Sequence, residues 1–142
     1  MCSGVGRSRI AKYRRSSAGA LTVLPLPANL RGMAQRERYL FVCTNRRAEG
    51  DPKGSCADRD AEAVRAALKE AISARGLAKL QARVCATSCL DQCSSGVTIL
   101  VEPDHYFYGR VTVADVPEIT AALREGRRVE RLVLAAADLA KG

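Results

Sequence analysis

The 142-residue chain is 47% hydrophobic and 27% charged, and no apolar run approaches the roughly 20 residues of a membrane-spanning helix. We therefore expect one globular domain with its own core and no membrane partner. The net charge of +8 comes mostly from residues 1–32, which hold six basic residues and no acidic one, whereas the other 110 residues hold 17 basic and 15 acidic residues. Because a nucleic-acid-binding domain carries its basic face on the folded part, we also expect no nucleic-acid partner.

Residues 1–35 form a separate compositional zone, rich in arginine, serine, glycine and proline and without sustained apolar periodicity. Such a composition predicts a flexible tail, or an over-extended start with Met33 as the natural first residue. A transit peptide for an organelle and a nucleic-acid-binding arm are less favoured alternatives. We expect the folded domain to span residues 36–142.

The folded part begins with residues 39–42, a short apolar run that predicts a buried strand ending at Cys43. A loop with glycine and proline follows. Apolar residues at helical spacing then predict a helix over residues 58–75, with acidic residues in its first turn and Gly76 as its stop.

Residues 82–87 alternate as in a half-buried strand, and residues 97–101 and 106–108 predict a hairpin. A helix is expected from Val116 to Glu125, with Asp115 and Glu118 as a capping box and Gly126 at its end. Residues 129–140 fit a final short helix or strand equally well. This order predicts a small α/β layer structure with a sheet of about four strands.

Cysteine is the residue type that points to chemistry. No secretory signal peptide is evident, so we expect a cytoplasmic protein whose clustered cysteines bind metal or carry out redox chemistry. The chain has no Cys-x-x-Cys pair, which excludes the usual dithiol oxidoreductase motif. Four cysteines lie in loops at the ends of predicted strands and helices, namely Cys43, Cys56, Cys89 and Cys93.

Two features of these loops favour an anionic metal site. Glycine-rich turns leave backbone N–H groups free to point at sulfur. Cys56 lies just ahead of the predicted helix, whose N-terminus should lower the pKa of its thiol. Arg46, Arg47 and Lys53 add positive charge, although each is also compatible with an ordinary solvated side chain.

The spacing by itself leaves the metal open. Four thiolates also make a structural zinc site, although zinc sites typically use tight pairs two to four residues apart, and 12 residues lie between Cys43 and Cys56. A single buried cysteine is also often a small hydrophobe rather than a ligand.

Three stretches, residues 41–45, 50–56 and 89–93, resemble the thioredoxin-like two-iron two-sulfur (2Fe–2S) ferredoxins. The resemblance covers about residues 37–134, with weaker matches at residues 108–109 and 129–132, and extends to the small cluster-bearing subunit of bacterial NADH dehydrogenases and hydrogenases. It implies a thioredoxin-like α/β fold with a small mixed sheet and flanking helices. It also implies one-electron transfer with redox protein partners, and a homodimer as a common assembly.

The resemblance further implies that Cys43, Cys56, Cys89 and Cys93 bind a 2Fe–2S cluster. Cys85 is an additional cysteine that we do not expect to be a ligand, and Cys2 is expected to be a free thiol.

We therefore expect an electron carrier and not an enzyme. A cluster-bearing subunit of a larger NAD(P)H-linked oxidoreductase or hydrogenase is the first alternative, and a zinc-stabilised binding module is the second. Three further features are interpreted as structural: His105 as a surface or packing residue, Asp91 as a partner for loop N–H groups, and the aromatic residues 106–108 as core and strand-surface residues.

Overall fold

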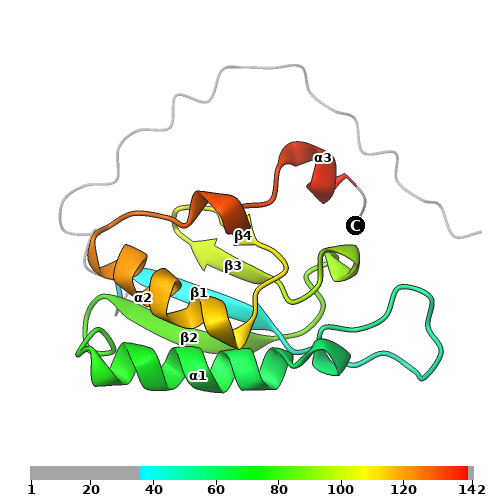
Figure 1. Cartoon of the computed structure of the whole chain (residues 1–142), viewed down its shortest axis with the longest axis horizontal. Helices are drawn as coiled ribbons and strands as arrows, with labels where there is room; N and C mark the ends of the chain where they lie inside the picture. Colours follow the sequence, from blue (N-terminus) through cyan, green and yellow to red (C-terminus); the bar gives the residue numbers. More distant parts are fainter. Residues whose placement is uncertain (1–35, 141–142) are drawn as a thin grey trace, which may run out of the picture. The chain divides into compact units, whose positions relative to one another are not determined.

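The computed structural model describes residues 36–140 (Figure 1). The predictions for residues 1–35, including Cys2, lie outside the described residues, so the domain division stays a prediction. The elements follow in the order β1 (Arg38–Cys43), η2 (Ala57–Arg59), α1 (Ala61–Ala74), β2 (Ala82–Thr87), η3 (Cys93–Ser95), β3 (Ile99–Glu102), β4 (Tyr106–Tyr108), η4 (Val113–Asp115), α2 (Val116–Arg124), η5 (Glu130–Leu132) and α3 (Ala136–Leu139).

The four strands form one mixed sheet in the order β2-β1-β3-β4. β1 pairs with β2 in parallel and with β3 antiparallel, and β3 pairs with β4 as an antiparallel hairpin. A parallel pair needs a long crossover connection, and η2 and α1 supply it here. This arrangement confirms the predicted α/β class with a four-stranded mixed sheet.

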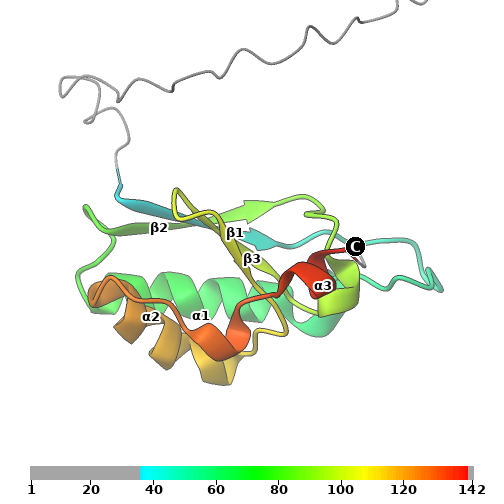
Figure 2. The same ribbon diagram turned by 90° about the horizontal axis from the view of Figure 1, so that it is seen from above.

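The core lies between the sheet and the two long helices, which cover the same face of the sheet (Figure 2). Side chains of a strand alternate between its two faces, and on the covered face Leu40, Val42, Ile99 and Val101 are 0% exposed. Leu68 of α1 and Ile119 of α2 complete this apolar layer, and both are also fully buried. In the described part of the chain, no helix is both long enough and apolar enough to cross a membrane.

The opposite face of the sheet is only half-buried. Its side chains form a row across all four strands in register, consisting of Cys85, Phe41, Leu100 and Phe107. Tyr39 lies beside this row, with its ring stacked 6.3 Å from that of Phe41. We refer to these five residues as the open face.

The first long helix differs from the prediction at its start. Asp60 adopts a left-handed conformation, with φ of 62°, and divides the expected helix into η2 and α1. The second strand of the hairpin agrees with the prediction, whereas β3 begins at Ile99, two residues later than expected. Gly76 lies in the left-handed region, with φ of 70°, where the first helix ends as predicted.

The expected capping box of Asp115 and Glu118 is wrong. Asp115 accepts hydrogen bonds from the backbone and side chain of Thr112, three residues before it, and so caps η4. Glu118 forms an ion pair with Arg131 instead. The ambiguous segment after residue 129 contains both kinds of structure: η5, a bridge of Val133 to Tyr108, and α3.

Leu68 offers a test of the core. It is 0% exposed, whereas Leu80, in the turn before β2, is 67% exposed. We expect Leu68→Ala to lower the free energy of unfolding by about 2–5 kcal/mol, because it removes buried methyl groups and leaves a cavity. The matched control Leu80→Ala should change it by less than about 0.5 kcal/mol. Urea unfolding followed by circular dichroism measures both, and equal effects would contradict this description of the core.

Candidate metal centre

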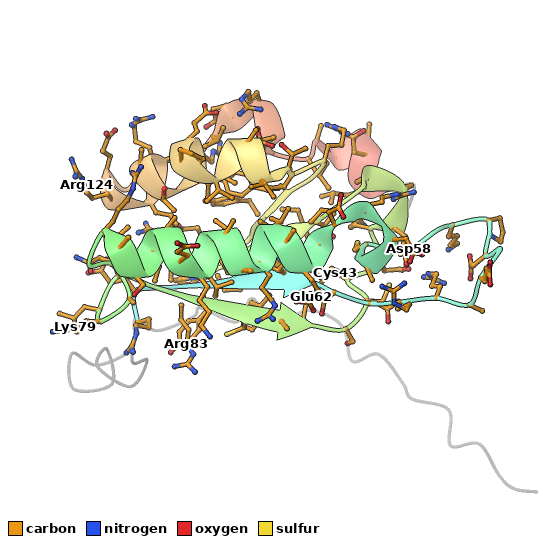
Figure 3. All side chains as sticks on the ribbon, turned by 60° about the horizontal axis from the view of Figure 1, so that its bottom comes forward. Cys43, Asp58, Glu62, Lys79, Arg83 and Arg124 are labelled. Carbon is orange, nitrogen blue, oxygen red and sulfur yellow. The ribbon has the colours of Figure 1, made fainter. Side chains whose placement is uncertain are left out.

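The four candidate cysteines come from two loop regions at one end of the sheet. Cys43 ends β1 and Cys56 immediately precedes η2, whereas Cys89 follows β2 and Cys93 begins η3. The parallel strands β1 and β2 finish at the same edge, which brings the loops after them together. Figure 3 shows Cys43 and Asp58 toward this end, away from Lys79 and Arg124.

Backbone hydrogen bonds hold the loops against the sheet. The N–H of Cys43 donates to the carbonyl of Thr98 at 3.1 Å, and the N–H of Thr44 donates to the carbonyl of Thr87 at 3.0 Å. The N–H of Ala57 donates to the carbonyl of Asn45 at 3.2 Å and closes the first loop on itself. The backbone around Cys43 and Cys56 is therefore fixed by short contacts to neighbouring segments.

Cys89 and Cys93 form the first sulfur pair, with 3.5 Å between their Sγ atoms. The backbone N–H of Asp91 donates to the sulfur of Cys89 at 3.3 Å, in a turn where Asp91 has a φ of 58°. This N–H, together with Cys93 and the guanidinium of Arg47, lowers the pKa of the Cys89 thiol against the opposing effect of burial. Asp91 thus bonds to the loop through its backbone N–H rather than through the side chain that we expected.

Arg47 connects both sulfurs of this first pair. Its Nη2 atom lies 3.3 Å from the sulfur of Cys93 and 3.5 Å from that of Cys89. These two hydrogen bonds raise the pKa of the guanidinium, and the one to Cys93 has the larger effect. Arg46 points elsewhere and pairs with Asp58, with both side chains more than half exposed. Of the two neighbouring arginines, only Arg47 contacts the sulfurs.

Cys43 and Cys56 form the second pair, and each is 1% exposed. The thiol of Cys56 donates to the carbonyl of Gly96 at 3.2 Å and lies 3.9 Å from the hydroxyl of Thr98. The pKa of the Cys56 thiol is raised to about 11. Burial is the larger cause, and the interaction with Cys43 is the next. The expected lowering by a helix N-terminus is wrong, because α1 begins only at Ala61 and Cys56 is followed by the short η2 instead.

Arg59 is a site residue that the sequence did not predict. Its Nη1 atom donates to the carbonyl of Cys93, and its Nη2 atom lies 3.0 Å from the position that a Cβ atom on Gly54 would occupy. Arg59 therefore links the first loop to the second. No sequence pattern indicated this role, since it depends on two loops that are far apart in the chain.

The donor set fits a two-iron cluster. In the described residues, no group of three or more His, Cys, Asp or Glu side chains converges as ligands for one metal ion. The thiols instead form two pairs, and a 2Fe–2S cluster on four thiolates takes two per iron. Arg47 Nε is a buried donor without a partner, as expected beside an anionic group with acceptor sulfurs. The buried acceptor Gln92 Oε1 also has no hydrogen-bond partner, and an anionic cluster does not explain this.

The remaining candidates lie outside the two pairs. Cys85 is in β2 opposite Phe41, and its side chain belongs to the open face. His105 has an 82% exposed side chain and contacts Glu102 at 2.7 Å, in agreement with its interpretation as a surface residue. Tyr108 is 0% exposed and packs edge-on against Tyr106, whereas Phe107 is half-buried on the open face.

Comparisons with known proteins agree with this geometry, although no protein-family model matches the chain. Over 98 residues the chain is 37% identical to a "Ferredoxin, 2Fe-2S" of Aquifex aeolicus, a match that covers 68% of this chain and 88% of the relative. A second "Ferredoxin, 2Fe-2S", from Clostridium pasteurianum, is 32% identical over 101 residues, or 70% of this chain and 98% of the relative.

Solved structures give the same result. The crystal structure of the thioredoxin-like [2Fe-2S] ferredoxin from Aquifex aeolicus matches with a TM-score of 0.67 and 36% identity, over 70% of this chain and 98% of that one. A cysteine-to-serine variant of that ferredoxin matches with a TM-score of 0.65 and 36% identity, over 69% and 98% of the two chains. With this fold, this identity and nearly the full length of its relatives, the chain belongs to the thioredoxin-like [2Fe-2S] ferredoxin family.

Proposed function

We propose that the protein is a one-electron carrier that holds a single 2Fe–2S cluster on Cys43, Cys56, Cys89 and Cys93. The observation that supports this most strongly is the arrangement of four thiols as two pairs in neighbouring loops at one end of the sheet. Zinc on four thiolates is less well supported, because the similar proteins are named 2Fe-2S ferredoxins.

Different residues of the protein would bind the cluster, exclude water and donate hydrogen bonds to sulfur. When bound, the cluster supplies the one-electron redox chemistry, and the four thiolates hold it. The nearly complete burial of Cys43 and Cys56 excludes water from one side. The N–H of Asp91 and the guanidinium of Arg47 donate to sulfur on the other side, where Cys89 is half-buried. Electrons would therefore enter and leave on the side of Cys89.

The partners that suit this role are other redox proteins. Relatives named as ferredoxins match over 88% and 98% of their length, which supports a free-standing carrier over a subunit of a larger oxidoreductase. The five cysteines of the described part are all free thiols, which supports a cytoplasmic location. With 17 basic and 15 acidic residues after residue 32, the folded part has little excess charge for nucleic acid, and we propose neither a nucleic-acid nor a membrane partner.

A homodimer is the assembly that we favour. The open face presents Phe41, Leu100 and Phe107 in one row without complete burial. Burial of aromatic and aliphatic side chains is the main favourable contribution to protein association. A second copy of the same face would supply that cover symmetrically.

The purified protein should be red-brown and contain about two irons per chain. The reason is that thiolate-to-iron charge transfer gives a 2Fe–2S protein visible absorption, whereas a zinc site is colourless. Metal analysis and an absorption spectrum check this. A colourless protein with one zinc per chain would refute the proposed function.

Replacing single cysteines should separate ligands from the additional thiol. We expect Cys89→Ser and Cys93→Ser to abolish the cluster or reduce its content severalfold, because each removes one of the two thiolates of an iron. Cys85→Ser is the matched control, with the same atom exchanged four residues before Cys89, and its visible spectrum should stay nearly unchanged. Bleaching by Cys85→Ser would show that the ligand assignment is wrong.

The dimer can be tested by sedimentation velocity. The wild type should sediment at about twice the 15.3 kDa chain mass, and Phe107→Glu should give monomers because it buries a charge at the interface. Val113→Glu, which places the same charge on a 47% exposed residue of η4, is the control and should remain dimeric. A monomeric wild type would contradict the proposed assembly and leave the electron-carrier function intact.

A further inference from the structure

We propose that Arg47 sets the reduction potential of the cluster by donating charge-assisted hydrogen bonds to the sulfurs of Cys89 and Cys93, an inference that rests on the function proposed above. The two contacts, at 3.3 and 3.5 Å, come from a single guanidinium nitrogen and reach both members of one cysteine pair. The positive charge therefore lies beside one half of the site rather than midway between the two pairs.

The arginine is held in this position by its own loop. Its Nη1 atom lies 3.6 Å from the carboxylate of Asp51, and both side chains are about one quarter exposed. The same carboxylate accepts a hydrogen bond from the backbone N–H of Lys53 at 2.9 Å, and the carbonyl of Asp51 accepts one from Gly54 at 2.9 Å. Asp51 thus orders the turn of the loop and anchors Arg47 at the same time.

The surroundings of the two pairs differ in what they offer to negative charge. Cys43 and Cys56 are 1% exposed, and the thiol of Cys56 contacts the carbonyl of Gly96 and the uncharged groups of Thr98. The pair of Cys89 and Cys93 receives a charged donor, the guanidinium of Arg47, in addition to the N–H of Asp91. Added negative charge is therefore stabilised better at the pair of Cys89 and Cys93, and Arg47 is the one cation that contacts sulfur among the described residues.

Reduction adds one electron, taken from a redox partner that is oxidised by one electron, and no bond or proton needs to change at Arg47. The extra negative charge spreads onto the thiolate sulfurs. A guanidinium that donates to those sulfurs stabilises the reduced form more than the oxidised form and so raises the potential. Because the contact is short and partly shielded from solvent, salt should screen it far less than it screens an exposed charge.

The test is the midpoint potential of cluster-loaded Arg47→Gln, Arg47→Lys and wild-type protein. We expect Arg47→Gln to lower the ratio of reduced to oxidised cluster at a fixed potential at least tenfold, which is a fall of 59 mV for one electron. Arg47→Lys should recover part of this shift, because it keeps the charge and loses the planar donor group. Electron paramagnetic resonance of the reduced proteins should show altered g-values in Arg47→Gln.

Arg46→Gln is the matched control. It removes the same charge one residue away, from a side chain that is 69% exposed and pairs with Asp58. The shift of the midpoint potential in Arg46→Gln should be small and should vanish at high salt, whereas the shift in Arg47→Gln should persist. Equal shifts in the two variants would overturn the inference.

Two other outcomes are distinguishable. If Arg47→Gln folds by circular dichroism but holds no iron, Arg47 serves assembly rather than the potential, and the inference fails while the carrier function stands. If the wild type holds no iron, the proposed function itself fails.

Discussion

The parallel pairing of β1 with β2 is the constraint on which the site depends. Both strands end at the same edge of the sheet, and each is followed by a loop that carries cysteine. The hydrogen bond from Thr44 to Thr87 extends this pairing into the loops, and the one from Cys43 to Thr98 extends the pairing of β1 with β3. The two pairs of cysteines, whose nearest members Cys56 and Cys89 are 33 residues apart in the chain, are brought to one place because hydrogen bonds of the sheet determine where each loop begins.

The sheet also creates the difference between the two pairs. β1 is a central strand, so the residue at its end remains inside the core, and Cys43 is almost fully buried together with Cys56. β2 is an edge strand, so the loop after it is closer to solvent, and Cys89 is half-buried. The strand order therefore places Cys43 and Cys56 inside and leaves Cys89 nearer to solvent. The fold of the loop after β1 brings the donor Arg47 to Cys89 and Cys93. A carrier needs both: protection of the cluster, and a side through which electrons pass.

Local patterns predicted the elements well where side-chain periodicity was decisive. Val64, Leu68 and Ile72 recur at helical spacing and are all buried in α1. Residues 106–108 form β4 as predicted. The predictions were wrong where backbone geometry or a distant partner decided the outcome. Asp60 interrupts the helix by adopting a left-handed conformation, which composition does not reveal. Glu118 does not form the expected capping box because it pairs with Arg131, 13 residues further on.

The sequence by itself determined the α/β class and supplied four cysteines as candidate ligands, because residue type and spacing specify the elements and the available thiols. The resemblance of the cysteine loops to known ferredoxins then favoured iron and sulfur over zinc. Only the tertiary structure decided which cation meets the sulfurs, because Arg46 and Arg47 are neighbours of identical type in the sequence. In the folded loop, Arg46 pairs with Asp58 on the surface, whereas Arg47 contacts Cys89 and Cys93. A hydrogen bond requires an approach to within a few ångströms, and that distance is set by the folded loop and not by the order of residues.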